Sequence, residues 1–163
     1  MRLDEYVRTD NNIETTRGNY GVCISMTTQW ILASKRYNGV TRTWQIGSGG
    51  AFRIRQAAGM IGQQTGDDSI IRNAGLVVVS QRNDPTLIGI ATQGYHILSI
   101  WNTAGNEGHS MGTWVAGNAY QFFDPNYGLY HADSSISLIG DVLTHCTTEY
   151  PGLNAEHISR KIA

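Results

Sequence analysis

The stretch that decides the fold is Gly21-Val22-Cys23-Ile24-Ser25-Met26-Thr27-Thr28-Gln29-Trp30, in which a glycine turn leads into an amphipathic run. Apolar residues then recur three to four positions apart, the spacing of one helical face: Met26, Trp30, Ala33 and Tyr37. The pair Asn38-Gly39 is a stop signal, because glycine adopts the left-handed backbone conformation without steric cost. The pattern therefore predicts a helix of about four turns, with Cys23 in its first turn.

The predicted position of Cys23 matters for its chemistry. Unpaired N–H groups and the helix dipole at a helix N-terminus favour the thiolate, which is the nucleophilic form of cysteine. The alternative is that Cys23 is a small buried apolar residue, as free cysteines commonly are. This segment alone leaves both interpretations open, so the rest of the chain has to decide between them.

The composition of the chain limits which folds and which kinds of partner are compatible with it. The chain has 163 residues, 40% of them apolar, and a net charge of −1, which favours one folded domain over 1–163 and argues against disorder. We predict a polar N-terminal arm or short helix within 1–20 and a peripheral tail at 151–163. The twelve basic residues form no run, so we expect no nucleic-acid partner.

Other motifs that would indicate ligands are missing from the sequence. No Cys/His pair has the spacing of metal ligands, so we predict no metal. The Gly-Ser-Gly-Gly at 47–50 is interpreted as a linker, because no Gly-Lys-Ser/Thr follows it, and we expect no cofactor. The polar start Met1-Arg2-Leu3-Asp4-Glu5 is unlike a signal peptide, and no apolar stretch approaches the ~18 residues that span a bilayer. We therefore expect synthesis in the cytoplasm and no membrane span.

The remaining segments predict an α+β fold, in which an N-terminal helical part carrying the cysteine helix packs on a C-terminal antiparallel sheet. Hydrophobic spacing changes from helical to strand-like at Gly94. Before that point we expect helices at 51–61 and 67–72, and a helix of one or two turns at 86–91. Residues 76–80 are expected to form either a short strand or the end of a helix-to-sheet connection.

After Gly94, strands are expected at 94–102, 109–115 and 119–123, and their short connections predict an antiparallel meander. A last helix begins after Asp133 or Ser134, either of which can cap it. We predict that this helix buries the stripe Ile136, Ile139, Leu143 and Cys146. Cys146 then has a structural role.

Nucleophilic cysteine chemistry needs a thiolate, a base that takes and returns its proton, and a group that orients the base. His109 opens one predicted strand, and Asp124 lies 15 residues later at the end of the next. Residues so placed in a hairpin can stand side by side on the sheet. The alternative interpretation is that His109 is a core histidine and Asp124 a turn residue before Pro125.

Three short stretches around these residues resemble the YopT/AvrPphB-type papain-like cysteine peptidases, which are bacterial effectors delivered into other cells. They are Gly21-Val22-Cys23 with Trp30, Gly108-His109-Ser110, and Phe122-Phe123-Asp124-Pro125-Asn126-Tyr127-Gly128. The resemblance runs from about Tyr20 to Tyr150. It implies a papain-like fold in which Cys23 is the nucleophile, His109 the general base and acid, and Asp124 the orienting carboxylate.

Papain-like enzymes also carry a side-chain amide shortly before the cysteine, where it helps to form the oxyanion hole. The position six before Cys23 is Arg17, which departs from that pattern. Asn19 is the nearest amide, and we predict that it acts with the Cys23 backbone N–H.

Other residues compete for these roles. His96 lies in the middle of a predicted strand, and His131 has no matching neighbours, so both are weaker candidates for the base. Ser110 is adjacent to His109 and therefore points to the opposite face of its strand. His145 and His157 have no partners in the sequence pattern.

A Cys-His-Asp site performs acyl transfer through a thioester. We expect hydrolysis of a protein amide bond, with glutamine deamidation, cleavage of a peptidoglycan cross-bridge or an inactive binding module as alternatives. The resemblance implies a protein substrate in a host or competitor cell, synthesis in a bacterial cytoplasm and delivery by a specialised secretion system. It also suggests a chaperone or an immunity protein as a partner.

Overall fold

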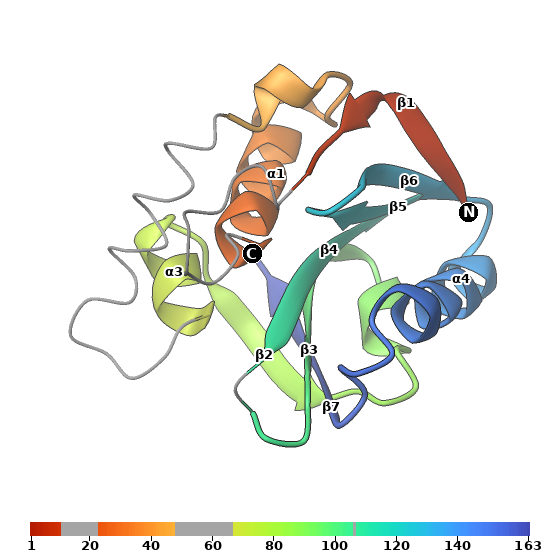
Figure 1. Ribbon diagram of the computed structural model, residues 1–163. Helices are drawn as coiled ribbons and strands as arrows, with labels where there is room; N and C mark the ends of the chain where they lie inside the picture. Colours follow the sequence, from red (N-terminus) through yellow and green to blue (C-terminus); the bar gives the residue numbers. More distant parts are fainter. Residues whose placement is uncertain (11–22, 48–66, 106) are drawn as a thin grey trace.

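The computed structural model describes residues 1–10, 23–47, 67–105 and 107–163 (Figure 1). The predicted helix at 51–61 and Asn19 lie outside these ranges. The described elements, in chain order, are β1 (Arg2–Arg8), α1 (Cys23–Tyr37), η1 (Thr43–Gln45), α3 (Asp67–Asn73), β2 (Val78–Asn83), η2 (Gly89–Ala91), β3 (Gly94–Trp101), β4 (Gly108–Ala116), β5 (Ala119–Asp124), β6 (Gly128–Ala132), α4 (Ser135–Glu149) and β7 (Glu156–Ile162).

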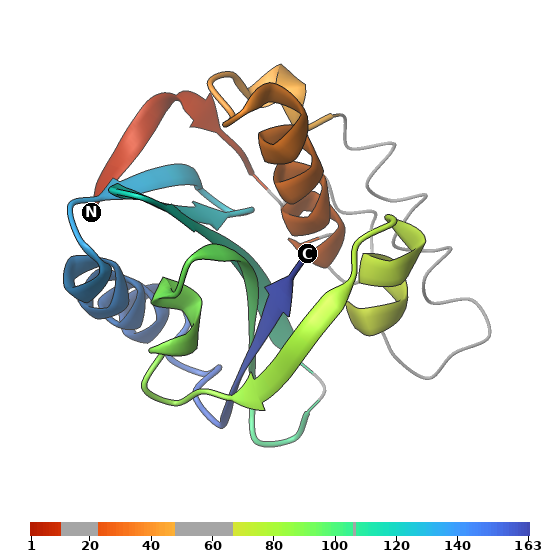
Figure 2. The same ribbon diagram turned by 180° about the vertical axis from the view of Figure 1, so that it is seen from behind.

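The strands form a seven-stranded sheet in the order β1-β6-β5-β4-β3-β7-β2, and all of its recorded pairs are antiparallel. Strands β3 to β6 are consecutive neighbours, so the predicted meander is present with one strand more than expected. Helices α1 and α3 pack on one face of the sheet and α4 on the other (Figures 1 and 2). The prediction of an α+β fold is confirmed.

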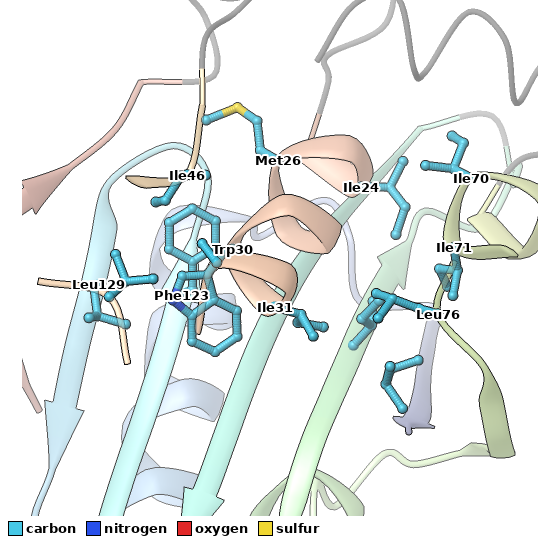
Figure 3. Close-up of a cluster of buried hydrophobic side chains, with 14 of the residues drawn as sticks. Ile24, Met26, Trp30, Ile31, Ile46, Ile70, Ile71, Leu76, Phe123 and Leu129 are labelled. Carbon is cyan, nitrogen blue, oxygen red and sulfur yellow. The ribbon is translucent and has the colours of Figure 1, made fainter. Parts of the chain in front are cut away.

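Helix α1 is anchored to the sheet by Trp30, whose side chain is completely buried. Its ring stacks on Phe123 of β5 at a centroid distance of 5.4 Å and an interplanar angle of 9°. Figure 3 shows the two rings among the aliphatic side chains of this cluster. Gly112 of β4 makes room for the tryptophan, because a Cβ there would lie 2.7 Å from Trp30 Cζ3.

Helix α4 begins at Ser135 after the cap Ser134, one of the two predicted caps. The face that it buries differs from the prediction. Ile136 is 82% exposed and Leu143 40% exposed, whereas the buried residues are Leu138, Val142 and Cys146. Two apolar stripes overlap in this helix, and spacing alone does not tell which one meets the sheet.

Cys146 does occupy the predicted core position. Burial, together with the negative charge of Asp124, raises the pKa of Cys146 to about 12. Its thiol therefore stays protonated at neutral pH, as expected for a structural cysteine.

Both ends of the described chain lie in the sheet, which corrects two predictions. The segment 2–8, expected as an arm or short helix, forms the edge strand β1 against β6. The tail at 151–163, expected to be peripheral, contains β7, which lies between β3 and β2. The charged residues of this segment made it look like a surface tail in the sequence. Arg160 is nevertheless buried, because its charge is paired with Asp68, whose Oδ1 is 2.8 Å from Arg160 Nε.

His96 of β3 makes the stability of the fold sensitive to low pH. Its Nε2 is 2.9 Å from Thr92 Oγ1, and among the described residues its Nδ1 has no hydrogen-bond partner. Burial, and then the positive charge of Lys161, lower the pKa of His96 to about 4. The unfolded chain, with an ordinary histidine pKa near 6.5, therefore binds more protons than the folded chain between about pH 6.5 and 4.

We expect stability to fall as the pH drops through that window, and His96→Gln to remove this contribution. Glutamine can still hydrogen bond to Thr92 but does not titrate. Between pH 7 and 5 the wild-type chain should lose about 2 kcal/mol more than His96→Gln. Urea unfolding at pH 7, 6 and 5 measures the difference, and equal losses in both proteins would contradict the assignment.

Candidate active site

The hairpin of β4 and β5 brings His109 and Asp124 into direct contact. His109 Nε2 lies 2.8 Å from Asp124 Oδ1, and the two residues are 5% and 0% exposed. The register pairs Gly112 with Phe123, so Asp124 at the end of β5 lies beside the start of β4, where His109 is. The side-by-side placement expected from the sequence is therefore what the structure contains.

Cys23 is the first residue of α1 and is partly exposed. Its thiol interacts with His109, and this interaction helps to raise the pKa of the imidazole. Because His109 Nε2 faces Asp124, Nδ1 is the ring nitrogen left for the cysteine. The imidazole thus interacts with both the carboxylate of Asp124 and the thiol of Cys23.

The charge state of His109 follows from this arrangement. Burial lowers its pKa, but the charge of Asp124, the hydrogen bond to Asp124 and the interactions with Cys23 outweigh burial. Together they raise the pKa of His109 to about 10. The imidazole is therefore cationic at neutral pH and can stabilise a thiolate on Cys23.

Asp124 is completely buried and accepts four hydrogen bonds. Oδ1 accepts from His109 Nε2 and from the backbone N–H of Asn126, at 2.8 and 2.9 Å. Oδ2 accepts from His145 Nε2 and Tyr150 Oη, at 2.7 and 2.8 Å. Burial raises the pKa of Asp124, but the positive charge of His109 and these hydrogen bonds hold it well below its usual range.

Two of these donors correct the sequence analysis. His145 was expected to lack a partner, yet it binds the candidate carboxylate. Tyr150 was not singled out, and its ring also stacks on His109 at 4.5 Å. If the buried face of α4 had been predicted correctly, it would have indicated His145, because His145 lies three residues after the buried Val142.

The competing residues bond elsewhere. His96 pairs with Thr92, and His131 Nε2 lies 3.1 Å from Asp4 Oδ2. Ser110 Oγ bonds to Ser99 Oγ at 3.0 Å, on the opposite face of the sheet from His109. Neither His96 and His131 nor this serine belongs to the group around Asp124.

The described residues contain no group of three or more His, Cys, Asp or Glu side chains able to hold a metal ion. Among the same residues, no helix has the length and apolar character needed to span a membrane.

A sequence profile of the Yersinia/Haemophilus virulence surface antigen family, which is peptidase family C58, matches residues 55–160. This chain belongs to that family. The matched range contains His109, Asp124 and Tyr150, and Cys23 precedes it. No curated protein sequence matches the chain.

Solved structures of similar fold agree with the family assignment. The Pseudomonas avirulence protein AvrPphB matches with a TM-score of 0.63 at 17% identity, covering 98% of this chain and 96% of AvrPphB. PatoxP, the cysteine protease-like domain of the Photorhabdus asymbiotica toxin PaTox, has a TM-score of 0.57 at 13% identity, covering 98% of this chain and 54% of that one. At these identities the likeness shows the fold. The family and the fold are those of papain-like, cysteine-protease-type effectors, which confirms the resemblance found in the sequence.

Proposed function

We propose that this chain is a cysteine hydrolase that cleaves an amide bond of a protein in a target cell. Cys23 is the nucleophile, His109 the general acid and base, and Asp124 the residue that orients His109. The observation that carries the proposal is the buried 2.8 Å hydrogen bond from His109 to Asp124, at an imidazole whose pKa Cys23 helps to raise. The family of virulence antigens supports a substrate in a host or competitor cell.

The proposed reaction begins when the Cys23 thiolate attacks the carbonyl carbon of the substrate amide. The His109 imidazolium gives its proton to the leaving nitrogen, the C–N bond breaks, and a thioester remains on Cys23. The neutral imidazole then takes a proton from water, whose oxygen attacks the thioester. Breakage of the C–S bond releases the acid and restores the thiolate and the imidazolium.

The negative oxygen of each tetrahedral intermediate needs hydrogen-bond donors. We propose the Cys23 backbone N–H and the Asn19 side chain, the latter from the sequence, since Asn19 lies outside the described residues. Loss of one such donor typically costs about 10²–10³-fold in kcat. Asn19→Ala should therefore lower kcat while leaving the reactivity of Cys23 toward a small alkylating reagent unchanged.

We also propose delivery from the producing bacterium by a specialised secretion system, as for other virulence effectors. A chaperone or an immunity protein would then bind the chain before its release. Glutamine deamidation uses the same triad and remains the second candidate reaction, because it also passes through a thioester and differs in the amide that is attacked.

The first test is alkylation with iodoacetamide at pH 6, followed by measurement of the intact mass. At this pH an ordinary thiol is almost fully protonated and reacts slowly. We expect rapid single labelling that is lost in Cys23→Ala and slowed in His109→Ala, while the buried Cys146 stays unlabelled. Labelling as slow as that of free cysteine would overturn the enzyme proposal and favour an inactive binding module.

The second test identifies the reaction. Wild-type protein and Cys23→Ala are incubated with a lysate of candidate target cells, and the peptides are compared by mass spectrometry. New protein N-termini that need Cys23 indicate a peptidase, whereas glutamine-to-glutamate conversions that need Cys23 indicate a deamidase.

A further inference from the structure

Two side chains, one near the C-terminal end of α4 and one just after it, reach the oxygen of the candidate carboxylate that His109 does not use. His145 Nε2 and Tyr150 Oη both donate to Asp124 Oδ2, at 2.7 and 2.8 Å. His109 uses the other oxygen, Oδ1. A carboxylate can rotate about its terminal torsion, so two donors on one oxygen also fix the direction of the other.

Tyr150 touches both partners of the His109–Asp124 pair. Its ring stacks on the imidazole at a centroid distance of 4.5 Å and an interplanar angle of 26°, while its hydroxyl donates to Asp124. The hydroxyl also accepts a hydrogen bond of 2.8 Å from Asn126 Nδ2. The tyrosine therefore fixes the plane of the imidazole and the orientation of the carboxylate at the same time.

His145 is itself held in place by its surroundings. Its side chain is 9% exposed, and it packs edge-on against three rings at 5.3 to 5.5 Å, those of Phe122, Tyr127 and Tyr130. The hydroxyl of Tyr127 is bonded in turn to Glu149 at the end of α4. With the ring so enclosed, its Nε2 is directed at Asp124.

We propose that Tyr150 and His145 are positioning residues, which hold Asp124 and His109 so that His109 Nδ1 stays directed at Cys23. This inference rests on the proposed function, because it assigns a role within the same site. Its physical basis is that displacement of a reacting group by about 1 Å can cost on the order of 10²-fold in rate. A merely structural role would change the stability of the fold and leave the reactivity of Cys23 as it is.

The test uses two variants of each residue. Tyr150→Phe removes the hydroxyl and keeps the stacked ring, whereas Tyr150→Leu removes both. His145→Gln keeps an N–H donor near the position of Nε2, whereas His145→Leu removes it. Tyr120→Phe and His131→Leu are the matched controls, because Tyr120 packs in the same layer and His131 bonds to Asp4.

The readout is the rate of Cys23 alkylation by iodoacetamide at pH 6 divided by the rate at pH 9, with the melting temperature measured in parallel. The alkylation rate at pH 6 depends on the imidazolium beside the sulfur. The ratio of the two rates therefore reports whether His109 is in place. We expect the ratio to fall at least about tenfold in both leucine variants. His145→Gln should recover most of the loss, Tyr150→Phe should lie between Tyr150→Leu and wild type, and both controls should keep the wild-type ratio.

The outcomes separate this inference from the proposed function. Leucine variants that melt cooperatively at a lower temperature but keep the wild-type ratio would overturn the positioning role. Should the leucine variants fail to fold, Tyr150→Phe decides, since it preserves the size and the stacked ring of the side chain. A Tyr150→Phe ratio equal to wild type would then overturn the role of the hydroxyl. A wild-type chain without fast labelling at pH 6 would instead overturn the proposed function itself.

Discussion

Replacement of Asp124 by Asn is expected to abolish the rapid reaction of Cys23 at pH 6 and to lower hydrolysis by about 10⁴-fold, the loss found for the equivalent change in a serine-protease triad. Asp124 is completely buried and accepts four hydrogen bonds, two on each oxygen. An amide replaces one of these acceptors by an NH₂ group, which then faces two donors. His109 also loses its negative partner, so that burial dominates and its pKa falls.

The same substitution should destabilise the fold in a pH-dependent way. The folded-state pKa of His109, about 10, is raised above its unfolded value near 6.5. The stabilisation that it receives is therefore complete below about pH 6.5 and disappears as the pH rises through 10. We expect Asp124→Asn to cost about 3 kcal/mol at pH 7 and less at pH 10.

Chemical denaturation at pH 7 and 10 checks this, together with alkylation at pH 6. Asp133→Asn is the matched control, because Asp133 is an exposed aspartate just before α4. An Asp124→Asn protein that is labelled at pH 6 as fast as wild type would show that the carboxylate does not control the site.

The parts of the fold that the sequence could predict are those set by local signals. Helix α1 follows from its apolar spacing and the stop at Asn38-Gly39, and the meander from short turns between strands. His109 and Asp124 were paired correctly for the same reason: they lie in adjacent strands of one hairpin, so their distance depends on a short stretch of chain.

What the sequence could not show depends on contacts between distant segments. Strand β7 reaches its place between β3 and β2 through pairings across 55 to 84 residues. Its Arg160 looks like a surface residue from the sequence, but it is paired with Asp68. Likewise, His145 and Tyr150 reach Asp124 because α4 crosses the sheet with its Leu138–Val142–Cys146 face inward. The apolar spacing within α4 is compatible with either of two buried faces, and packing against the sheet determines which one is buried.

Substitutions of Gly112 test whether the packing of α1 on the sheet sets the position of Cys23 beside His109. Gly112→Ala and Gly112→Val are expected to move α1 away from β4 and so to separate Cys23 from His109. A Cβ at position 112 would lie 2.7 Å from Trp30 Cζ3, far inside ordinary contact distance. The tryptophan ring cannot retreat, because it is fully buried and stacks on Phe123.

We expect Gly112→Ala to cost about 1–3 kcal/mol, the usual penalty for overpacking a core, and Gly112→Val to cost more. Because Cys23 begins the same helix that carries Trp30, both variants should also lower the rate of alkylation at pH 6 by at least about tenfold. Gly140→Ala is the matched control, since a Cβ there meets nothing within 4 Å and alanine favours the helix.

Thermal unfolding and the alkylation rate at pH 6, measured on the same samples, separate the two effects. Trp30→Phe in the Gly112→Ala background should restore part of both, because the smaller ring leaves room for the new methyl group; this makes a double-mutant cycle between the two positions. Gly112→Ala with a lowered melting temperature but the wild-type alkylation rate would mean that the sulfur stays beside His109 when the helix shifts. The position of Cys23 would then be set by the residues that precede α1 rather than by the packing of Trp30 on the sheet.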